Sequence, residues 1–351
     1  MNLTTLPHDI SVAWSRAEAF IVTSPELAGI GLAIGAGALL AVIIMALTAL
    51  VRALASARRA ALASAVRRTN DVGARILIVS GMPGRQKAIS GFLRKTCETH
   101  LKDFMFGGPF RVIHYPGSLE GDEQATKLLK RTECDLVIWA ETPRGAKGVA
   151  RILSRPSNPF ETQRPPITLA MSKERSTWNE PMARAMAYAA AKQFRPALGR
   201  PQDFRAERLQ PVVETLLTIL AAKPKVDPKL LAEMVDDAAT GSLQLAFAGD
   251  DTWIDKSVEI ATSTLAEINR SVAPDRWIAA KVTLGRALRL RAEKRFDPVM
   301  LREGIAHLTE ALDALRSEPR FKLAESAAQA IGDAQKLLGT RRKFSISGGS
   351  I

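Results

Sequence analysis

The sequence predicts an α+β/α protein with three structured parts: one transmembrane helix, a small α/β domain and an α-helical solenoid of stacked helix pairs. Residues 27–51 contain no charged side chain, which predicts the first part. Residues 74–200 alternate short apolar runs with helical periodicity, and residues 201–340 are helical in pattern with breaks at proline and glycine. The remaining segments are an N-terminal tail (1–26), a basic juxtamembrane helix (52–73) and a C-terminal tail (341–351) that we expect to be disordered.

The composition excludes several kinds of site. The chain has 351 residues and a formal net charge of +13, which favours an anionic partner of unspecified kind. Its two cysteines, Cys97 and Cys134, are too few for a disulfide framework or a four-thiolate zinc site, and its four histidines are scattered. We therefore expect no metal and no cofactor. We recognise no catalytic motif in the sequence, so we do not expect an enzyme.

The uncharged run of 25 residues over 27–51 predicts a membrane crossing. As a helix it would be ~37 Å long at ~1.5 Å per residue, against a hydrocarbon core of ~30 Å. Residues 1–26 carry one arginine against three carboxylates (net −2), whereas residues 52–68 carry five arginines and no carboxylate (net +5). Because Lys and Arg stay on the cytoplasmic side, we expect a single-pass protein of bacterial inner-membrane type, with its N-terminus outside and its larger domains in the cytoplasm. The alternatives are a cleaved signal peptide and a buried core helix.

Two features of this helix concern its partners. Gly31 and Gly35 form a G-x-x-x-G step, which favours a homodimer by close helix approach, although glycine is common in membrane helices generally. The apolar run is expected to continue as one helix into the basic segment. In that segment, we expect anionic lipid headgroups to attract the arginines. The alternative is that the arginines only set the orientation of the helix in the membrane, without a lipid preference. These arginines are Arg52, Arg58, Arg59, Arg67 and Arg68.

Residues 74–200 predict a mainly parallel or mixed sheet with helical crossovers. Helical patterns at 87–101 and 119–130 separate the strands, and a helix over 180–194 closes the domain. Apolar runs predict strands at 76–79, 110–114 and 136–139, with weaker candidates at 152–153 and 166–170.

One strand-to-helix turn in this domain is a candidate phosphate site. Residues 80–87 read Ser-Gly-Met-Pro-Gly-Arg-Gln-Lys and precede a predicted helix, where phosphates bind. The spacing fits neither a Walker A loop nor a dinucleotide-binding glycine motif. Arg85 and Lys87 would hold a phosphate here, and a plain turn is the alternative. Residues 141–148 form a second glycine-rich, basic loop, for which a mobile loop tip is favoured.

A likeness to known α/β modules rests on residues 135–141, Asp-Leu-Val-Ile-Trp-Ala-Glu. This strand resembles one in the amino-terminal modules of the CsgG and TolB families, over roughly residues 74–195. The resemblance implies a role in assembly or interaction, and it assigns no catalytic residue.

The helical domain is expected to contain stacked helix pairs. Residues 277–288, Trp-Ile-Ala-Ala-Lys-Val-Thr-Leu-Gly-Arg-Ala-Leu, resemble a tetratricopeptide repeat (TPR), in which a small residue such as Gly285 lets the paired helix pack closely. Gly332 lies in a similar string 47 residues later, a longer period than the usual 34. Ala306 and Ala311 approximate the small positions of the second helix. The six predicted helices are 208–222, 229–248, 253–269, 277–294, 298–316 and 321–338.

Stacked helix pairs form a concave groove for partner peptides. The register of the resemblance places Val282, Arg286 and Arg289 in that groove, with Gln329 and Lys336 in the following unit. A basic groove would bind acidic side chains or a peptide carboxylate, whereas the alternative is a solvated charged face.

These patterns predict a membrane-anchored cytoplasmic scaffold or adaptor that binds a protein partner through its TPR-like helices. The alternative is a membrane-tethered nucleotide-binding sensor or enzyme that uses the turn from Gly81 to Lys87. We recognise no helix-turn-helix, zinc finger or aromatic RNA-binding platform in the sequence, so we expect no nucleic-acid partner.

Overall fold

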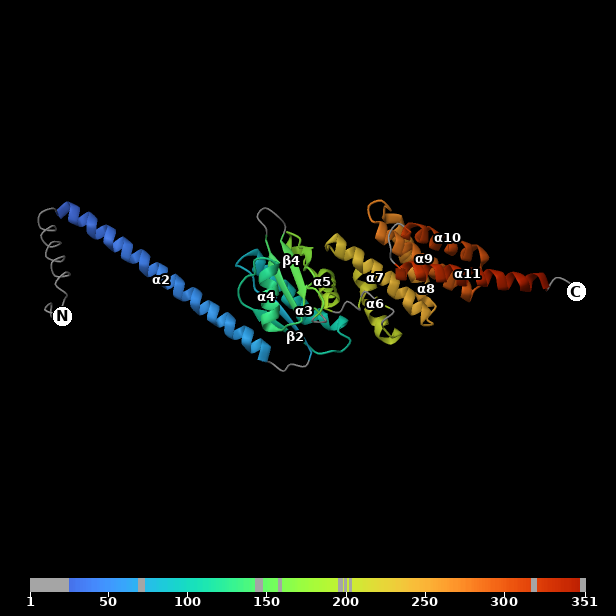
Figure 1. Ribbon diagram of the computed structural model, residues 1–351, viewed down its shortest axis with the longest axis horizontal. Coiled ribbons are helices and arrows are strands. Elements are labelled where there is room, and N and C mark those ends of the chain that lie inside the picture. The colour runs from blue at the N-terminus through green and yellow to red at the C-terminus, as the bar shows by residue number, and fades with distance from the viewer. Residues whose placement is uncertain are drawn as a thin grey trace. The chain divides into compact units, whose positions relative to one another are not determined.

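The structure is a computed structural model of the chain (Figure 1). It divides the chain into two compact units, Met1–Ala65 and Val66–Ile351. The predicted N-terminal tail lies almost wholly outside the described residues. Those residues are 25–68, 73–142, 148–156, 160–194, 198, 201, 204–316 and 321–347.

Helix α2 (Pro25–Arg68) is a single helix of 44 residues, so the predicted continuation into the basic segment is confirmed. Its part Ala36–Arg67 is long and apolar enough to cross a membrane. Side chains such as Ile44 and Leu47 are exposed, whereas a helix of a soluble protein would bury an apolar stripe against its core. By length and composition, α2 is a candidate membrane anchor or signal segment. Gly31 and Gly35 lie in it four residues apart, hence on one face, and their role in a dimer stays a prediction.

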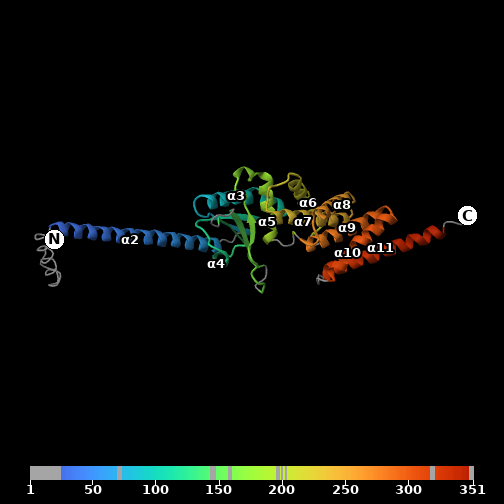
Figure 2. The same ribbon diagram turned by 90° about the horizontal axis from the view of Figure 1, so that it is seen from above.

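A five-stranded mixed sheet begins the second unit (Figures 1 and 2). Strands β2, β1 and β3 are parallel, with Ile76 opposite both Val112 and Leu136. Strand β4 pairs antiparallel with β3, and β5 pairs antiparallel with β4. The two weaker strand candidates of the sequence are thus the antiparallel part of the sheet. The strands are β1 (Ala74–Val79), β2 (Phe110–Tyr115), β3 (Leu136–Glu141), β4 (Val149–Ser154) and β5 (Ile167–Ala170), in the order β2-β1-β3-β4-β5.

Helices cover both faces of this sheet. Helices α3 (Arg85–His100) and α5 (Glu180–Phe194) pack against each other and on the sheet, while α4 (Asp122–Thr132) lies on the opposite face from α3 (Figure 2). Helix α4 starts three residues later than predicted, because Gly121 has a φ of +83° that an α-helix does not allow. The part of this domain that the structure describes also contains the short 3₁₀ helices η2 (Leu101–Phe104) and η3 (Arg175–Thr177).

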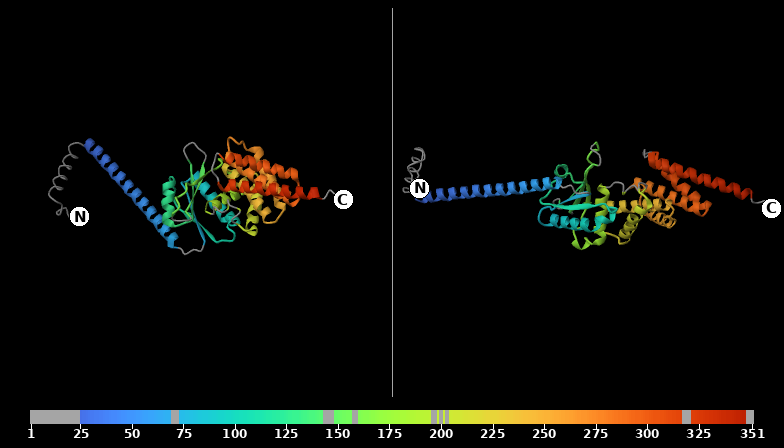
Figure 3. Two further views of the ribbon diagram at one scale, coloured as in Figure 1. Left: turned by 45° about the vertical axis from the view of Figure 1, so that its right-hand side comes forward. Right: turned by 90° about the horizontal axis from the view of Figure 1, so that it is seen from below.

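Six helices follow in a run in which each packs against the next (Figure 3). Helices α7, α9 and α10 begin with proline, which has no N–H to leave unpaired in the first turn. Asp227 and Asp297 cap α7 and α10 by accepting hydrogen bonds from backbone N–H groups. The helices are α6 (Ala206–Ala221), α7 (Pro228–Phe247), α8 (Thr252–Glu267), α9 (Pro274–Lys294), α10 (Pro298–Leu315) and α11 (Phe321–Ser347).

The structure corrects three expectations about the last helices. Helix α11 continues to Ser347, past residue 341, where the sequence predicts a disordered tail. A Cβ on Gly285 would lie 2.6 Å from Leu308 Cγ, so the predicted close packing of α9 and α10 is confirmed, whereas a Cβ on Gly332 would meet no described residue within 4 Å. The alignment of the two glycines is therefore wrong, because Gly332 lies on an exposed side of α11. Ala306 is exposed as well, while Ala311 is buried.

The core continues past residue 200, where the sequence predicts a domain boundary. Met234 of α7 belongs to the same buried cluster as the sheet residues that face α3. Tyr188 and Lys192 of α5 both donate hydrogen bonds to Asp237 of α7. Asp227, which caps α7, also accepts a hydrogen bond from the backbone N–H of Ala170 at the edge of the sheet (2.9 Å). These contacts fix the start of the helical run on the sheet layer.

Candidate functional site

Three helices enclose the candidate site. Helix α7 contacts α9, and α9 contacts α11, so these helices lie in a row. Between them is a hollow of about 470 Å³, which we call the groove. Within each helix the lining residues recur at spacings of three and four, which places them on one face. They are Thr240, Leu243 and Gln244 of α7, Ala279, Val282, Thr283 and Arg286 of α9, Leu323 and Ser326 of α11, and Pro201.

Glycines on other faces of α7 and α9 let the neighbouring helices approach. A Cβ on Gly241 would lie 2.6 Å from Val213 Cγ2 of α6. A Cβ on Gly304 of α10 would lie 3.0 Å from the carbonyl oxygen of Gly285. These distances are shorter than ordinary van der Waals contact, so larger residues here would push the helices apart. The glycines therefore help to position the helices that carry the groove.

Among the described residues that line the groove, Arg286 is the charged one. Its guanidinium carbon lies 4.8 Å from the centroid of the Phe247 ring, which is a cation–π distance. Burial, and secondly the neighbouring Arg289, lower the pKa of Arg286. No carboxylate pairs with it in the part of the chain that the structure describes. The surroundings thus disfavour the charged form, and an anion bound nearby would stabilise it.

Arg289 lies one turn further along α9 and is paired within the chain. Its Nη1 is 3.3 Å from Glu293 Oε2 and 3.6 Å from Asp333 Oδ2 of α11. Its side chain is 15 % exposed, and its Nε has no hydrogen-bond partner among the described residues. It also lies against Phe247, at 5.6 Å from the ring centroid. Arg289 thus adds positive potential beside Arg286, although two carboxylates partly compensate it.

The other residues that the sequence assigns to a groove divide into two groups. Val282 lines the groove together with Arg286. Gln329 and Lys336 are exposed on α11 and are not among the lining residues. Their placement depends on the alignment of Gly332 with Gly285, which the structure contradicts. Helix α11 instead contributes residues nearer its start.

Helix α7 supplies a side of the site that the sequence analysis missed. Thr240, Gln244 and Phe247 recur at spacings of four and three, and the first two line the groove. This pattern is visible in the sequence, but any amphipathic helix shows one like it. Only the contact between Phe247 and the arginines of α9 distinguishes this face, and that contact joins residues about forty positions apart.

At the turn after β1, Arg85 and Lys87 lie in different surroundings, and a phosphate site there stays a prediction. Arg85 Nη2 donates to the carbonyl oxygen of Ser172 (3.1 Å), whereas Lys87 is exposed. The backbone N–H of Met82 donates to Gln86 Oε1 (2.9 Å), and that of Lys87 donates to the carbonyl of Met82 (3.1 Å). These groups are thus already used within the turn. The second loop, over 141–148, lies largely outside the described residues.

The sequence analysis also missed a serine–histidine pair beside this turn. Ser80 Oγ lies 2.8 Å from His114 Nε2, at the carboxyl ends of β1 and β2. Nucleophilic catalysis also needs free donors to stabilise an oxyanion. The backbone N–H groups of Ser80 and Gly81 instead donate to the carbonyls of Tyr115 and Gly117. The pair alone therefore gives no support for an acyl-transfer site.

Thiol and metal chemistry have no supporting geometry in the described residues. Burial, with Glu98 as a smaller cause, raises the pKa of the Cys97 thiol to about 12, and burial also raises the pKa of Cys134. Both thiols are therefore protonated at neutral pH. Across the described ranges, no group of three or more His, Cys, Asp or Glu side chains is placed to hold a metal ion.

The arginines at the end of α2 differ in their surroundings. Arg52 and Arg58 are exposed. Arg67 Nε lies 2.9 Å from Glu133 Oε1, and Arg75 Nη1 donates to the carbonyl of Val66 (3.1 Å). Arg67 is also exposed but is paired with a carboxylate of the same unit, so Arg52 and Arg58 are the better candidates for lipid headgroups.

Comparisons with known proteins identify no relative. No family model, no curated protein and no solved structure matches the chain. The function therefore has to be argued from the groove itself.

Proposed function

We propose that the chain is a single-pass membrane adaptor whose groove binds an acidic segment of a partner protein. The observation that carries this proposal is Arg286. Its guanidinium lines the groove beside a second arginine, without a pairing carboxylate in the described ranges. Taking a cation out of water is unfavourable unless a counter-charge compensates it. A carboxylate from a partner would supply that charge.

The rest of the groove suits a peptide. A guanidinium binds a carboxylate through two parallel N–H···O bonds, and Phe247 shields one side of it from water. Gln244 and Thr283 offer amide and hydroxyl groups to a peptide backbone, whereas the Thr240 hydroxyl already donates to the carbonyl of Asp236 (2.9 Å) and can only accept. The hollow of about 470 Å³ holds a few side chains, and the rest of a longer segment would lie across the row of helices. The resemblance of residues 277–288 to a tetratricopeptide repeat supports this use of α9.

The location follows from α2 and its flanking charge. A helix that exposes its apolar side chains is stable in a bilayer, which solvates them. The arginines after the apolar run favour a cytoplasmic location for the second unit at a bacterial-type inner membrane, because Lys and Arg stay on the cytoplasmic side. Arg52 and Arg58 would contact anionic lipid headgroups. Protease added outside intact cells is expected to leave the second unit uncut, and cleavage there would contradict this topology.

Photocrosslinking in cells that express the full chain tests the adaptor function. A photoreactive amino acid replaces Gln244, which lines the groove, or Gln329, an exposed glutamine of α11 outside it, as the matched control. We expect position 244, but not position 329, to crosslink to a segment rich in Asp and Glu. Crosslinks from position 244 only to segments without carboxylates, or the same crosslinks from both positions, would contradict the proposal.

A further inference from the structure

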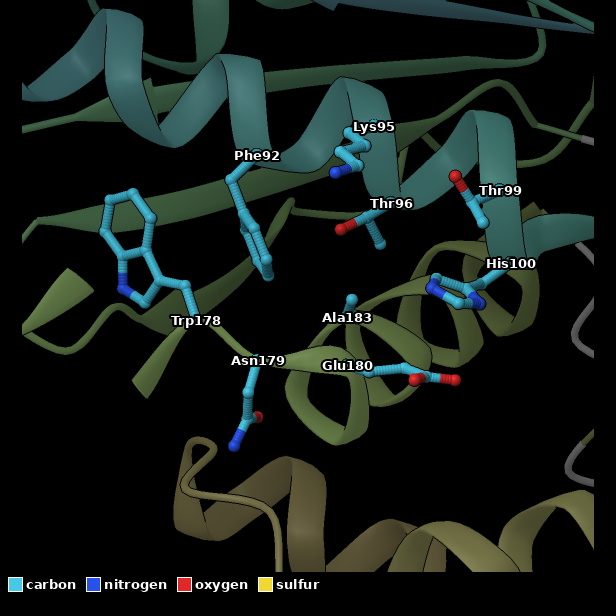
Figure 4. A pocket seen from close by; sticks show the side chains of 9 residues that line it. All are labelled: Phe92, Lys95, Thr96, Thr99, His100, Trp178, Asn179, Glu180 and Ala183. Carbon is cyan, nitrogen blue, oxygen red and sulfur yellow. The ribbon is translucent and has the colours of Figure 1, made fainter. Parts of the chain in front are cut away.

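A second cavity lies in the α/β layer, between α3 and the start of α5 (Figure 4). Its volume is about 480 Å³, within the range of ~300–1,000 Å³ that is typical of small-molecule sites. It shares no lining residue with the groove. The residues that matter for its chemistry are Phe92, Lys95, Thr96 and His100 of α3, Trp178, and Glu180 of α5.

One end of this cavity is aromatic. The rings of Phe92 and Trp178 have centroids 5.5 Å apart and planes inclined at 39°, and Figure 4 shows them side by side at one end. Trp178 Nε1 donates to the carbonyl oxygen of Ser172 (3.3 Å), which helps to orient the indole. Both side chains are only half-buried. A flat apolar group could therefore pack on their open faces.

The other end is polar and carries a net positive charge. Glu180 Oε1 lies 2.9 Å from Arg184 Nη2, so its charge is already compensated. Burial and then Arg184 lower the pKa of His100, so its imidazole is neutral at pH 7 and offers a hydrogen bond instead of a charge. Lys95 has no ion pair with any residue that the structure describes. Its ammonium is thus the uncompensated charge at this end.

Thr96 provides an unpaired hydroxyl beside the cavity. Its side chain is 2 % exposed, and its Oγ1 forms no hydrogen bond within the described ranges. A buried threonine of a helix usually donates to the carbonyl four residues earlier, as Thr132 does to Leu128 (2.8 Å). Figure 4 shows the Thr96 hydroxyl turned toward the space between α3 and α5. A ligand oxygen placed there would accept the missing hydrogen bond.

We infer that this cavity binds a small organic anion with a flat apolar body, of the aryl carboxylate class. The aromatic body packs against Phe92 and Trp178. The carboxylate pairs with Lys95 and accepts a hydrogen bond from Thr96. This binding does not depend on the proposed adaptor function, because none of the groove residues takes part in it.

Fluorine NMR of a fluoronaphthoate tests the inference, with the full chain in bilayer discs of neutral lipid and empty discs as the blank. We expect saturable line broadening with a Kd on the order of 0.1–1 mM. Lys95→Glu is expected to weaken binding about five- to tenfold. Arg94→Glu makes the same charge change at the neighbouring exposed residue of α3, outside the cavity, and is expected to bind like the unaltered chain.

A second variant separates ligand binding from helix stability. Thr96→Val keeps the side-chain volume and removes only the hydroxyl, so the fold should remain while binding weakens about three- to tenfold. The neutral methyl ester of the probe should also bind more weakly than the anion. The inference is overturned if the unaltered chain shows no saturable binding. It is also overturned if the chain with Lys95→Glu and the chain with Thr96→Val both bind the probe as tightly as the unaltered chain does.

Discussion

Two arginines of helix α9 lie in opposite surroundings. Near the start of the helix, Arg276 forms a bidentate pair with Asp236 of α7, with Nε 2.8 Å from Oδ2 and Nη2 2.9 Å from Oδ1. This pair raises the pKa of Arg276. Ten residues later, Arg286 lines the groove, and burial and Arg289 lower its pKa. The first charge holds two helices together, whereas the second has no pairing carboxylate among the described residues.

The largest expected effect is on partner binding. Arg286→Ala should reduce affinity for the acidic segment by about 2–5 kcal/mol, because the partner's carboxylate loses its bidentate donor. Arg302→Ala, an exposed arginine of α10 outside the groove, is the matched control. Titration calorimetry measures both. A loss of affinity that is the same in the two variants would show that general charge, and not the groove, governs binding.

The next effect is on the helix packing that presents Arg286. Gly285→Ala should lower the free energy of unfolding by about 1–3 kcal/mol, because the new Cβ would overlap Leu308. Gly332→Ala has open space and should raise it by about 0.5–1 kcal/mol, through helix propensity. Denaturant titration distinguishes the two. Equal destabilisation by both would restore the repeat alignment that the structure contradicts.

Arg276, which is paired with Asp236, should affect stability and not partner binding, the reverse of what we expect for Arg286. Arg276→Ala should lower the free energy of unfolding by about 1–2 kcal/mol, since the half-buried Asp236 loses both hydrogen bonds. Partner affinity should stay unchanged. Asp236→Asn should lower the free energy of unfolding less in the Arg276→Ala variant than in the unaltered chain. A double-mutant cycle on unfolding midpoints would show this difference.

The smallest expected effect is on the stability of the free chain, in which no partner is bound at Arg286. Arg286→Met keeps the apolar stem and removes the uncompensated charge, so stability should be unchanged or raised by up to about 1 kcal/mol. Thermal unfolding of the free chain measures this. Destabilisation similar to that of Arg276→Ala would mean that Arg286 has a structural partner after all.

The sequence predicts local features of this molecule better than distant pairings. Helices α7 and α10 lie within one residue of their predicted bounds, because Asp-Pro at 227–228 and 297–298 combines a cap with a proline first turn. Strands β4 and β5 are only weak candidates in the sequence, since their stability comes from antiparallel pairing with β3 and with each other. No local pattern encodes that pairing.

The candidate site shows the same limit. The sequence assigns Val282 and Arg286 to a partner-binding groove from one helix and its resemblance; both line the hollow between α7, α9 and α11, and partner binding there stays a prediction. The sequence assigns Lys336 by aligning two similar strings, but among the described residues no helix packs on Gly332 as α10 packs on Gly285. Phe247 contacts Arg286 only because α7 and α9 pack side by side. Such contacts between helices require the three-dimensional arrangement.

A charge swap across the groove tests the central claim most directly. Once photocrosslinking has identified the acidic segment, its contacting carboxylate is changed to lysine and combined with Arg286→Glu. The account predicts that either change alone abolishes binding in titration calorimetry and that the two together restore much of it. Binding that survives Arg286→Glu, or that the combined changes fail to restore, would contradict the claim that this arginine holds a partner's carboxylate.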